Sequence, residues 1–137
     1  MQIKLWRAAN HPFIGGDAAA FSLATKRKCA EGYLRGGGGL GGEDLFSIDV
    51  DIDPEKFLDL GTDQWEAVDR LCEFLECNGV SLSIEERRSA WPYKILDNYR
   101  ELIEEMGIWW VRYPEEYPRG CISVDYYGPT LEMDEAL

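Results

Sequence analysis

One arginine and a few late carboxylates have the best positions in this sequence for acting on a ligand. Residues 2–7, QIKLWR, alternate Ile3 and Leu5 with other positions, which is typical of a short strand, and Arg7 comes at its end. A guanidinium at the edge of a sheet can hold a phosphate or a ribose through two parallel hydrogen bonds. The alternative interpretation of Arg7 is an ordinary solvated charge at a strand terminus.

The carboxylates lie near the C-terminus. Glu115 and Glu116 stand between two prolines, in a loop that connects two predicted strands. A fixed carboxylate can stabilise positive charge that develops on a ligand, although adjacent acids on an exposed loop are usually just solvated. Asp125 lies inside the second of these strands, where we expect it to share the solvent-facing side with Ser123.

A predicted helical segment early in the chain carries further candidates. Phe21 and Ser22 precede it, Thr25 can cap it, and Tyr33 closes it. Ser22 is either a turn hydroxyl or a ligand hydroxyl. Tyr33 is either part of the core, as its helical spacing indicates, or a ring that stacks on a planar ligand. The glycine run at 36–42 follows a helix and lacks dinucleotide-loop spacing, so we interpret it as a flexible connector.

The elements that must position these residues predict one domain, residues 1–137, of the α+β class. Alternation with period two predicts a strand at 46–52, and apolar spacings of three and four from Trp65 to Leu75 predict a helix. Two more helical segments follow, of which the first has a capping box and the second ends at Gly107. Two strands flank the acidic loop. This order favours a mixed, mostly antiparallel sheet with helices packed on it.

The composition limits the kinds of partner. A formal net charge of −12 opposes direct binding to nucleic-acid phosphates. The same charge would suit a protein that imitates nucleic acid and occupies a basic groove on a partner, and it would equally keep a small protein soluble. We expect no membrane association, since no apolar run is long enough to span a bilayer. The usual cysteine and histidine motifs for metals are missing, so no metal is expected.

The cysteines are scattered along the chain without a paired spacing, at Cys29, Cys72, Cys77 and Cys121. We interpret them as reduced thiols that pack like small apolar side chains. No signal peptide precedes the first predicted strand. Together these features predict a cytoplasmic protein.

Several segments, taken in order, resemble the ADP-ribosyltransferase-like fold. They are LWRA near the N-terminus, FSLATKRKCAEGY, the predicted strand DLFSIDVDID followed by FLDL, and a helix ending in glycine before two late strands with an acidic turn. In that family an arginine or histidine ends the first strand, a Phe-Ser step leads to a helix that closes with a tyrosine, and a carboxylate lies at or just before a late strand. The stretch GIWWVRYPEEYPRGCISVDYYG also resembles phage-encoded anti-CRISPR members of this fold.

The resemblance implies an NAD-dependent mono-ADP-ribosyltransferase that modifies a protein target, as phage or toxin-type effectors do. Its cofactor-binding residues would be Arg7, Phe21, Ser22 and Tyr33. Arg7 would hold the ribose or phosphate of NAD, and Ser22 would support the ribose beside the nicotinamide. The catalytic carboxylate would be Glu115, Glu116 or Asp125. Glu115 and Glu116 match the family pattern better than Asp125, which lies within the final strand.

The acidic surface would steer such an enzyme toward a target with a basic surface. The alternative is a non-enzymatic acidic binding protein that blocks a basic groove by imitating nucleic acid. A third interpretation is a protein that keeps this fold but has lost the catalytic carboxylate.

Overall fold

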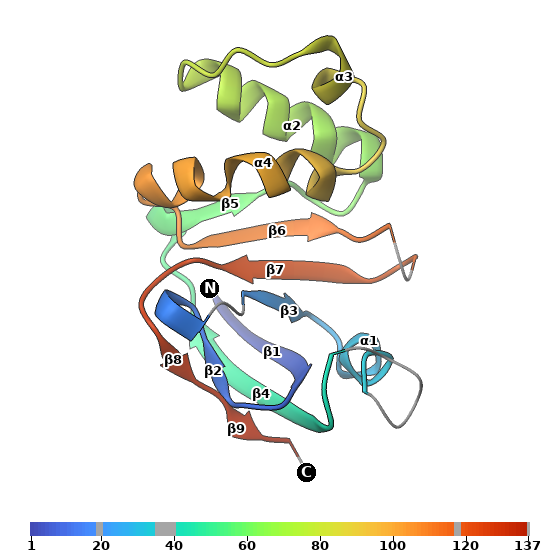
Figure 1. Cartoon of the computed structure of the whole chain (residues 1–137), viewed down its shortest axis with the longest axis vertical. Coiled ribbons are helices and arrows are strands. Elements are labelled where there is room, and N and C mark those ends of the chain that lie inside the picture. Colours follow the sequence, from blue (N-terminus) through green and yellow to red (C-terminus); the bar gives the residue numbers. More distant parts are fainter. Residues whose placement is uncertain (19–20, 35–40, 117–118, 137) are drawn as a thin grey trace.

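The chain folds around one seven-stranded sheet (Figure 1). A computed structural model of residues 1–137 describes all of them except 19–20, 35–40, 117–118 and 137. Every neighbouring pair of strands in the sheet is antiparallel except the first. In order across the sheet, the strands are β5 (Phe57–Asp59), β6 (Trp110–Pro114), β7 (Ile122–Tyr126), β3 (Ser22–Ala24), β1 (Gln2–Ala9), β4 (Asp44–Asp51) and β9 (Asp134–Glu135).

A two-stranded ribbon and the helices complete the architecture. The ribbon consists of β2 (Phe13–Ile14) and β8 (Leu131–Glu132), and short 3-10 turns lie at Gly16–Ala18 and Pro54–Lys56. The helices are α1 (Arg27–Glu31), α2 (Gln64–Cys77), α3 (Ile84–Arg87) and α4 (Pro92–Glu105). The predicted α+β class with a mostly antiparallel sheet is therefore confirmed.

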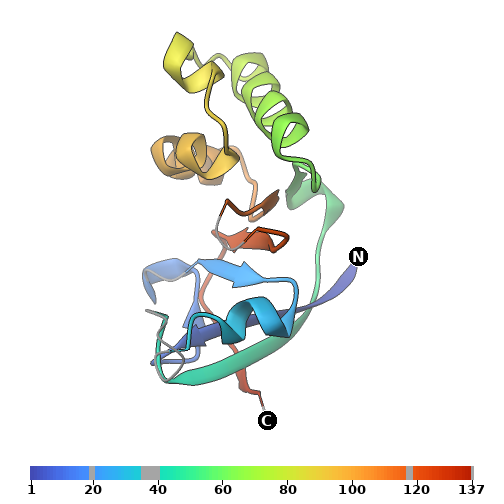
Figure 2. The same cartoon turned by 90° about the vertical axis from the view of Figure 1, so that its right-hand side faces the viewer.

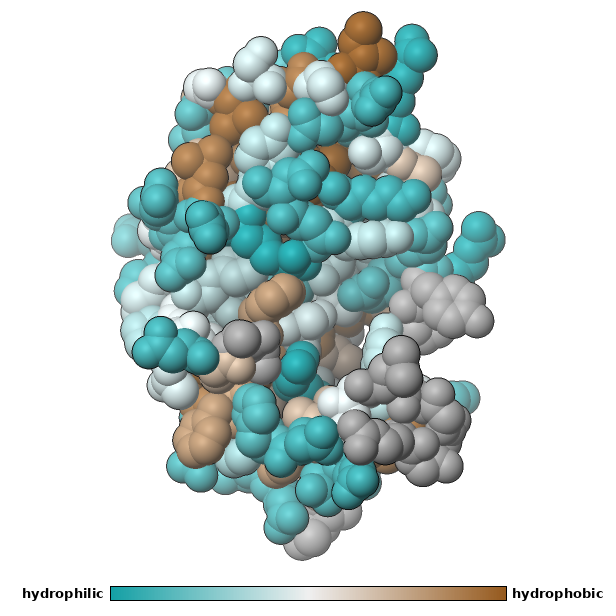
Figure 3. Space-filling model, viewed as in Figure 1, coloured by the Kyte–Doolittle hydropathy of each residue, from teal (hydrophilic) through white to brown (hydrophobic). Residues whose placement is uncertain are grey.

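The helices fall into two groups. α2 and α4 contact each other and β6, and they form the end of the molecule farthest from the C-terminus (Figures 1 and 2). α1 contacts β1 and β3 instead. Figure 3 shows hydrophilic side chains over most of the face seen in Figure 1, interrupted by hydrophobic patches that include the helical end. α1 packs near the middle of the sheet, apart from α2 and α4.

Two main hydrophobic clusters hold the sheet and helices together. One joins α2 and α4 to the sheet, and its fully buried members include Leu60, Leu71, Leu75, Ile95, Leu96, Ile103 and Val111. The other gathers side chains in or next to β1, β3, β4 and β7, among them Leu5, Leu23, Phe46, Ile52, Val124 and Tyr126. Burial of an aliphatic or aromatic side chain contributes about 1.5–3 kcal/mol relative to exposure. Both clusters thus fix the strands that border the candidate site.

Most predicted elements are present close to their expected bounds. The first strand extends through Ala9, and the strand expected at 46–52 is found as β4. The capping box of α3 forms, because Ser83 accepts from the amide of Glu86 while the Glu86 side chain accepts from the amide of Ser83. Gly107 follows α4 with a φ of 85°, a conformation that favours glycine.

The early helical segment differs from the prediction. Thr25 is not the cap; its hydroxyl donates to the carbonyl of Ile122 at 2.9 Å, and Lys26 precedes the helix without a side-chain cap. Ser22 begins a strand, β3, because the residues before α1 pair with β7. Tyr33 follows α1 and is 43% exposed, so of its two interpretations the one that places it in the core is wrong. Trp65, expected on the inner face of α2, is 61% exposed.

The prediction that all four cysteines are reduced thiols is wrong. Cys29 on α1 and Cys121, just before β7, form a disulfide with a Cα–Cα distance of 6.0 Å. The two residues are 92 positions apart in sequence, and they meet because β3, which leads into α1, pairs with β7. Cys72 and Cys77 are free thiols. The cytoplasmic prediction loses the support that four reduced cysteines gave it.

The glycine run at 36–42 was expected to be a flexible connector. Residues 36–40 of it lie outside the described residues. Gly42 forms an isolated bridge with Leu34, and the amide of Gly41 donates to the carbonyl of Tyr33 at 2.8 Å. An added Cβ at Gly41 would meet the backbone oxygen of Ala8 at 2.8 Å, so a larger residue would not fit there.

Candidate functional site

Four of the residues chosen from the sequence line one cavity. It has a volume of about 160 Å³ and lies against β1, β3 and α1, with the residue after β6 closing one side. Its walls are formed by Trp6, Arg7, Ala8, Ser22, Leu23, Ala24, Ala30, Tyr33, Gly41, Glu115 and Ser123. We call it the Arg7 cavity. An arginine, two hydroxyl-bearing residues, an aromatic ring and a carboxylate therefore border the same space.

Arg7 reaches the cavity because β1 and β3 separate there. These strands are paired at Trp6 and Ala24. Beyond that point the guanidinium spans to β3, where Nη1 donates to the carbonyl of Ser22 at 2.6 Å. Nε is buried and has no hydrogen-bond partner within the described part of the chain. Burial lowers the pKa of Arg7, while the charge of Asp125 raises it. Since arginine keeps its proton under ordinary conditions, this is a partly desolvated cation with unused donor capacity.

Glu115 is fixed from both its backbone and its side chain. Its amide donates to the carbonyl of Cys121 at 2.9 Å, and its Oε1 accepts from the hydroxyl of Ser123 at 2.7 Å. Burial raises its pKa, and this is opposed by the hydrogen bond from Ser123, by the nearby hydroxyl of Tyr113 and by the charge of Arg100. The carboxyl group is thus held in place, while its negative charge is only partly balanced by its surroundings.

Ser22 and Tyr33 border the same cavity from different elements. Ser22 lies opposite Asp125 in the β3–β7 register, so the two side chains share a face of the sheet. Tyr33 lies just after α1, where its amide donates to the carbonyl of Ala30 at 3.0 Å. Burial raises the pKa of Tyr33, and the charge of Glu115 raises it further. The charge of Glu115 therefore acts on the phenol of Tyr33.

Two predicted residues lie elsewhere. Phe21 lines a neighbouring hollow of about 520 Å³, which we call the Phe21 hollow, where the guanidinium of Arg100 lies 4.2 Å from the centre of its ring. Glu116 points to α4, where its Oε2 accepts from the hydroxyl of Tyr93 at 2.5 Å. Of the two adjacent acids, Glu115 alone lines the Arg7 cavity.

Asp125 was expected to face solvent, and this was wrong because it is 0% exposed. The face of β7 that carries Ser123 and Asp125 also carries Tyr113 of the paired strand β6, and Arg100 of α4 reaches it instead of water. Tyr113 and Tyr127 donate to the two carboxylate oxygens at 2.8 and 2.7 Å. Burial raises the pKa of Asp125 from 3.8 to about 6. Asp125 is therefore a buried, fully hydrogen-bonded acid that a ligand does not reach.

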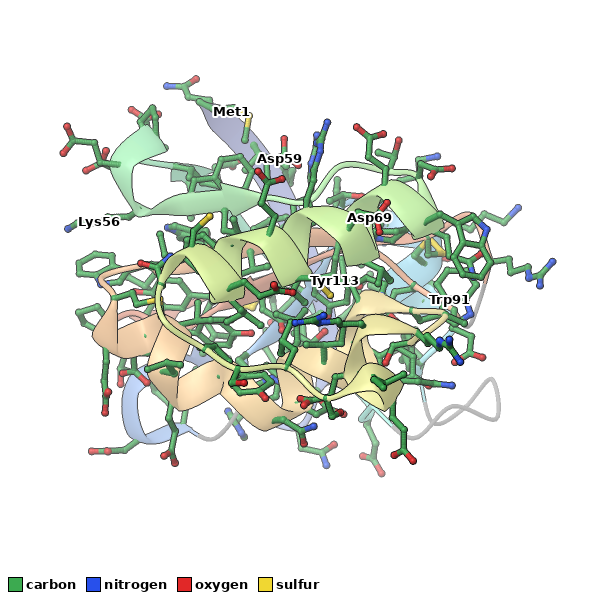
Figure 4. The ribbon with its side chains drawn as sticks, turned by 90° about the horizontal axis from the view of Figure 1, so that it is seen from above. Met1, Lys56, Asp59, Asp69, Trp91 and Tyr113 are labelled. Carbon is green, nitrogen blue, oxygen red and sulfur yellow. A yellow bond between two sulfur atoms is a disulfide. The ribbon has the colours of Figure 1, made fainter. Side chains whose placement is uncertain are left out.

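Sequence reasoning missed three polar groups around these acids, namely Ser123, Tyr113 and Arg100. Viewed from above, Tyr113 lies near the centre of the molecule (Figure 4). A signal was present, because Ser123 and Asp125 alternate with Val124 and Tyr126, and polar residues on one side of a strand can face a polar interior. Arg100 gave no comparable signal, since a charged residue on a helix is usually solvated.

The arrangement suits a ligand with several chemical parts. Arg7 and the hydroxyl groups can bind phosphate or sugar oxygens, Tyr33 can contact a planar ring, and Glu115 can face developing positive charge. The described residues contain no cluster of three or more metal-ligating side chains.

Comparisons with known proteins identify no relative. No family model, curated protein or solved structure matches this chain significantly. Among the helices of the described residues, none is long and apolar enough to cross a membrane. The function must therefore be argued from the site itself.

Proposed function

We propose that this protein is an NAD-dependent mono-ADP-ribosyltransferase that modifies a protein target, built on an ADP-ribosyltransferase-like domain. The observation that carries the proposal is that Arg7, Ser22, Tyr33 and Glu115 line one cavity. Arg7, Ser22 and Tyr33 come from the N-terminal part of the chain, whereas Glu115 comes from a loop between two late strands. Each has the chemistry that the proposed role needs.

The residues of the Arg7 cavity fit one end of NAD. The buried Nε of Arg7 has no hydrogen-bond partner in the described chain, and a ribose or phosphate oxygen would supply one. The volume of about 160 Å³ is below the roughly 300 Å³ typical of small-molecule sites, so the cavity would take the nicotinamide riboside end and leave the rest outside it. Arg7 and Ser22 would hold sugar or phosphate oxygens, and Tyr33 would contact the nicotinamide ring.

Glu115 would supply the electrostatic part of the reaction. NAD carries a positively charged nicotinamide, and cleavage of its bond to ribose spreads positive charge onto the sugar. A carboxylate held beside that sugar stabilises the charge, as in glycoside cleavage. The hydrogen bond from Ser123 keeps the carboxylate of Glu115 in one orientation. A cationic ligand would also lower the pKa of Glu115, which burial raises in the free protein.

The net charge of −12 bears on the choice of target. Long-range attraction would favour a protein with a basic surface, such as a nucleic-acid-binding groove. On α4, acidic side chains are exposed at Asp97, Glu101, Glu104 and Glu105. This helix would present negative charge to the target near the site, since Asp97 also affects the pKa of Glu115.

The test is incubation of the protein with NAD and basic candidate targets, with nicotinamide release and added target mass as readouts. Glu115→Gln should retain NAD binding in calorimetry but lose about 100-fold or more in turnover, because one fixed charge in the site is removed. Glu116→Gln is the matched control, since Glu116 lies next to Glu115 but binds Tyr93 outside the cavity. If NAD does not bind, or if both variants behave alike, the proposal is wrong.

The exposed acids of α4 favour a second candidate, a non-enzymatic protein that blocks a basic groove. Such a complex would form without NAD and would weaken steeply with salt, because exposed charges are screened over about 8–10 Å at ordinary ionic strength. Glu115→Gln would leave its affinity nearly unchanged, whereas charge removal on α4 would reduce it. Binding that is insensitive to salt would rule this candidate out.

A further inference from the structure

One carboxylate without exposed surface lies between the Arg7 cavity and the Phe21 hollow. Asp125 accepts hydrogen bonds from Tyr113 on β6 and from Tyr127 just after β7. Arg100 Nε, from α4, lies 3.7 Å from its Oδ2. A buried carboxylate is costly unless it is paired and hydrogen-bonded, and here three partners meet that requirement.

The partners of Asp125 border both spaces. Tyr113 also interacts with Glu115 and with Ser22, which line the Arg7 cavity. Arg100 and Tyr127 line the Phe21 hollow on the other side. Asp125 lies opposite Ser22 in the strand register, and Ser22 lines the Arg7 cavity. The carboxylate of Asp125 therefore lies between the Arg7 cavity and the Phe21 hollow.

Two arginines depend on this one acid for charge balance. The charge of Asp125 raises the pKa of Arg7 and of Arg100, in both cases against the effect of burial. Each arginine has a buried Nε without a hydrogen-bond partner in the part of the chain that the structure describes. Arg100 has a second acid nearby, Asp97, whereas the charge that acts on Arg7 is that of Asp125.

We propose that Asp125 is a positioning residue of the site: it touches no ligand, but it fixes the hydroxyl of Tyr113 beside Glu115 and balances the charges of Arg7 and Arg100. The inference deepens the proposed function and rests on it for the identity of the ligand. The electrostatic coupling between Asp125 and Glu115 does not depend on the proposed function. A direct catalytic role for Asp125 does not fit, since both of its oxygens are occupied and buried.

The coupling can be measured without NAD, by a carbon-13 NMR titration of the Asp125 carboxyl group. Glu115→Gln should lower the pKa of Asp125, because the nearby negative charge that raises it is removed. Tyr113→Phe should raise the pKa of Asp125, because a hydrogen bond that favours the ionised form is lost. Asp69→Asn, on an exposed position of α2, should leave it unchanged. The inference would be overturned if this pKa shifted equally in both test variants, or if it shifted in neither.

The second measurement is NAD binding across pH. At about pH 8, Asp125→Asn should weaken NAD affinity about tenfold, with a smaller effect on turnover, because small misplacements of binding groups are costly. The difference in NAD affinity should vanish near pH 5, because the carboxyl group of Asp125 in the wild-type protein, with a pKa of about 6, is itself neutral there. A gap that persists at low pH would mean that Asp125 is merely structural. If wild-type NAD binding is absent, the proposed function fails, while the titration still decides the coupling.

Discussion

Replacing Asp125 by asparagine should remove a pH dependence of stability that the buried carboxylate imposes. Burial raises the pKa of Asp125 from 3.8 to about 6 in the folded protein. Between these two values the folded state binds more protons than the unfolded chain. The free energy of unfolding contributed by this group is therefore highest below the unfolded pKa and falls as the pH rises through the folded pKa.

The magnitude follows from the size of the shift. Each pKa unit corresponds to about 1.4 kcal/mol, so a shift of roughly two units gives about 3 kcal/mol. Asp125 is 0% exposed, so solvent does not screen this effect. Asparagine cannot ionise and keeps an oxygen that can accept from Tyr113 or Tyr127. The free energy of unfolding of the variant minus that of wild type should therefore rise by about 3 kcal/mol as the pH rises from about 4 to about 7.

The assay is urea denaturation followed by tryptophan fluorescence at several pH values. Other acids, such as Asp59, titrate in both proteins, so the difference between the two stability curves isolates Asp125 to first order. Asp69→Asn, at an exposed position of α2, is the control, and its free energy of unfolding should stay within about 0.5 kcal/mol of wild type. A difference for Asp125→Asn that varies by less than about 0.5 kcal/mol over this range would refute the reasoning, because that is the scale of ordinary surface substitutions.

Three further predictions concern stability. Reduction of the Cys29–Cys121 disulfide should lower the free energy of unfolding by about 4–5 kcal/mol for a loop of this length, measured by urea denaturation with and without a dithiol. Leu71→Ala should cost about 2–5 kcal/mol in the same assay, whereas Trp65→Ala should cost far less, since Leu71 is fully buried and Trp65 is 61% exposed. Ser83→Ala should cost about 1 kcal/mol through loss of the α3 cap, and Ser83→Thr should restore most of it.

The parts of the fold that were predicted correctly are those with local signals. Period-two alternation located β4, helical spacing located α2, and Gly107 marked the end of α4. The convergence of Arg7 with Glu115 was expected from the family resemblance, and both residues do line one cavity. Local pattern and cap chemistry therefore carried most of the secondary structure.

The parts that were missed depend on contacts between distant segments. Ser22 lies in a strand because β7 pairs with it, and a three-residue strand has too few residues to show a periodic pattern. Asp125 is buried because two tyrosines and Arg100 reach it from separate elements. A strand pattern gives the alternation of faces but not which face meets water. The disulfide has the same origin, since its two cysteines meet only through the pairing of β3 with β7.

That disulfide also changes the connectivity of the chain. Cys29 and Cys121 close a covalent ring that contains β4, β5, β6 and the three helices α2, α3 and α4, while the remaining strands lie on the two tails outside it. A protease that cuts once inside the ring would leave the molecule in one piece. The nicked protein would run as a single species on a non-reducing gel and separate into two fragments after reduction.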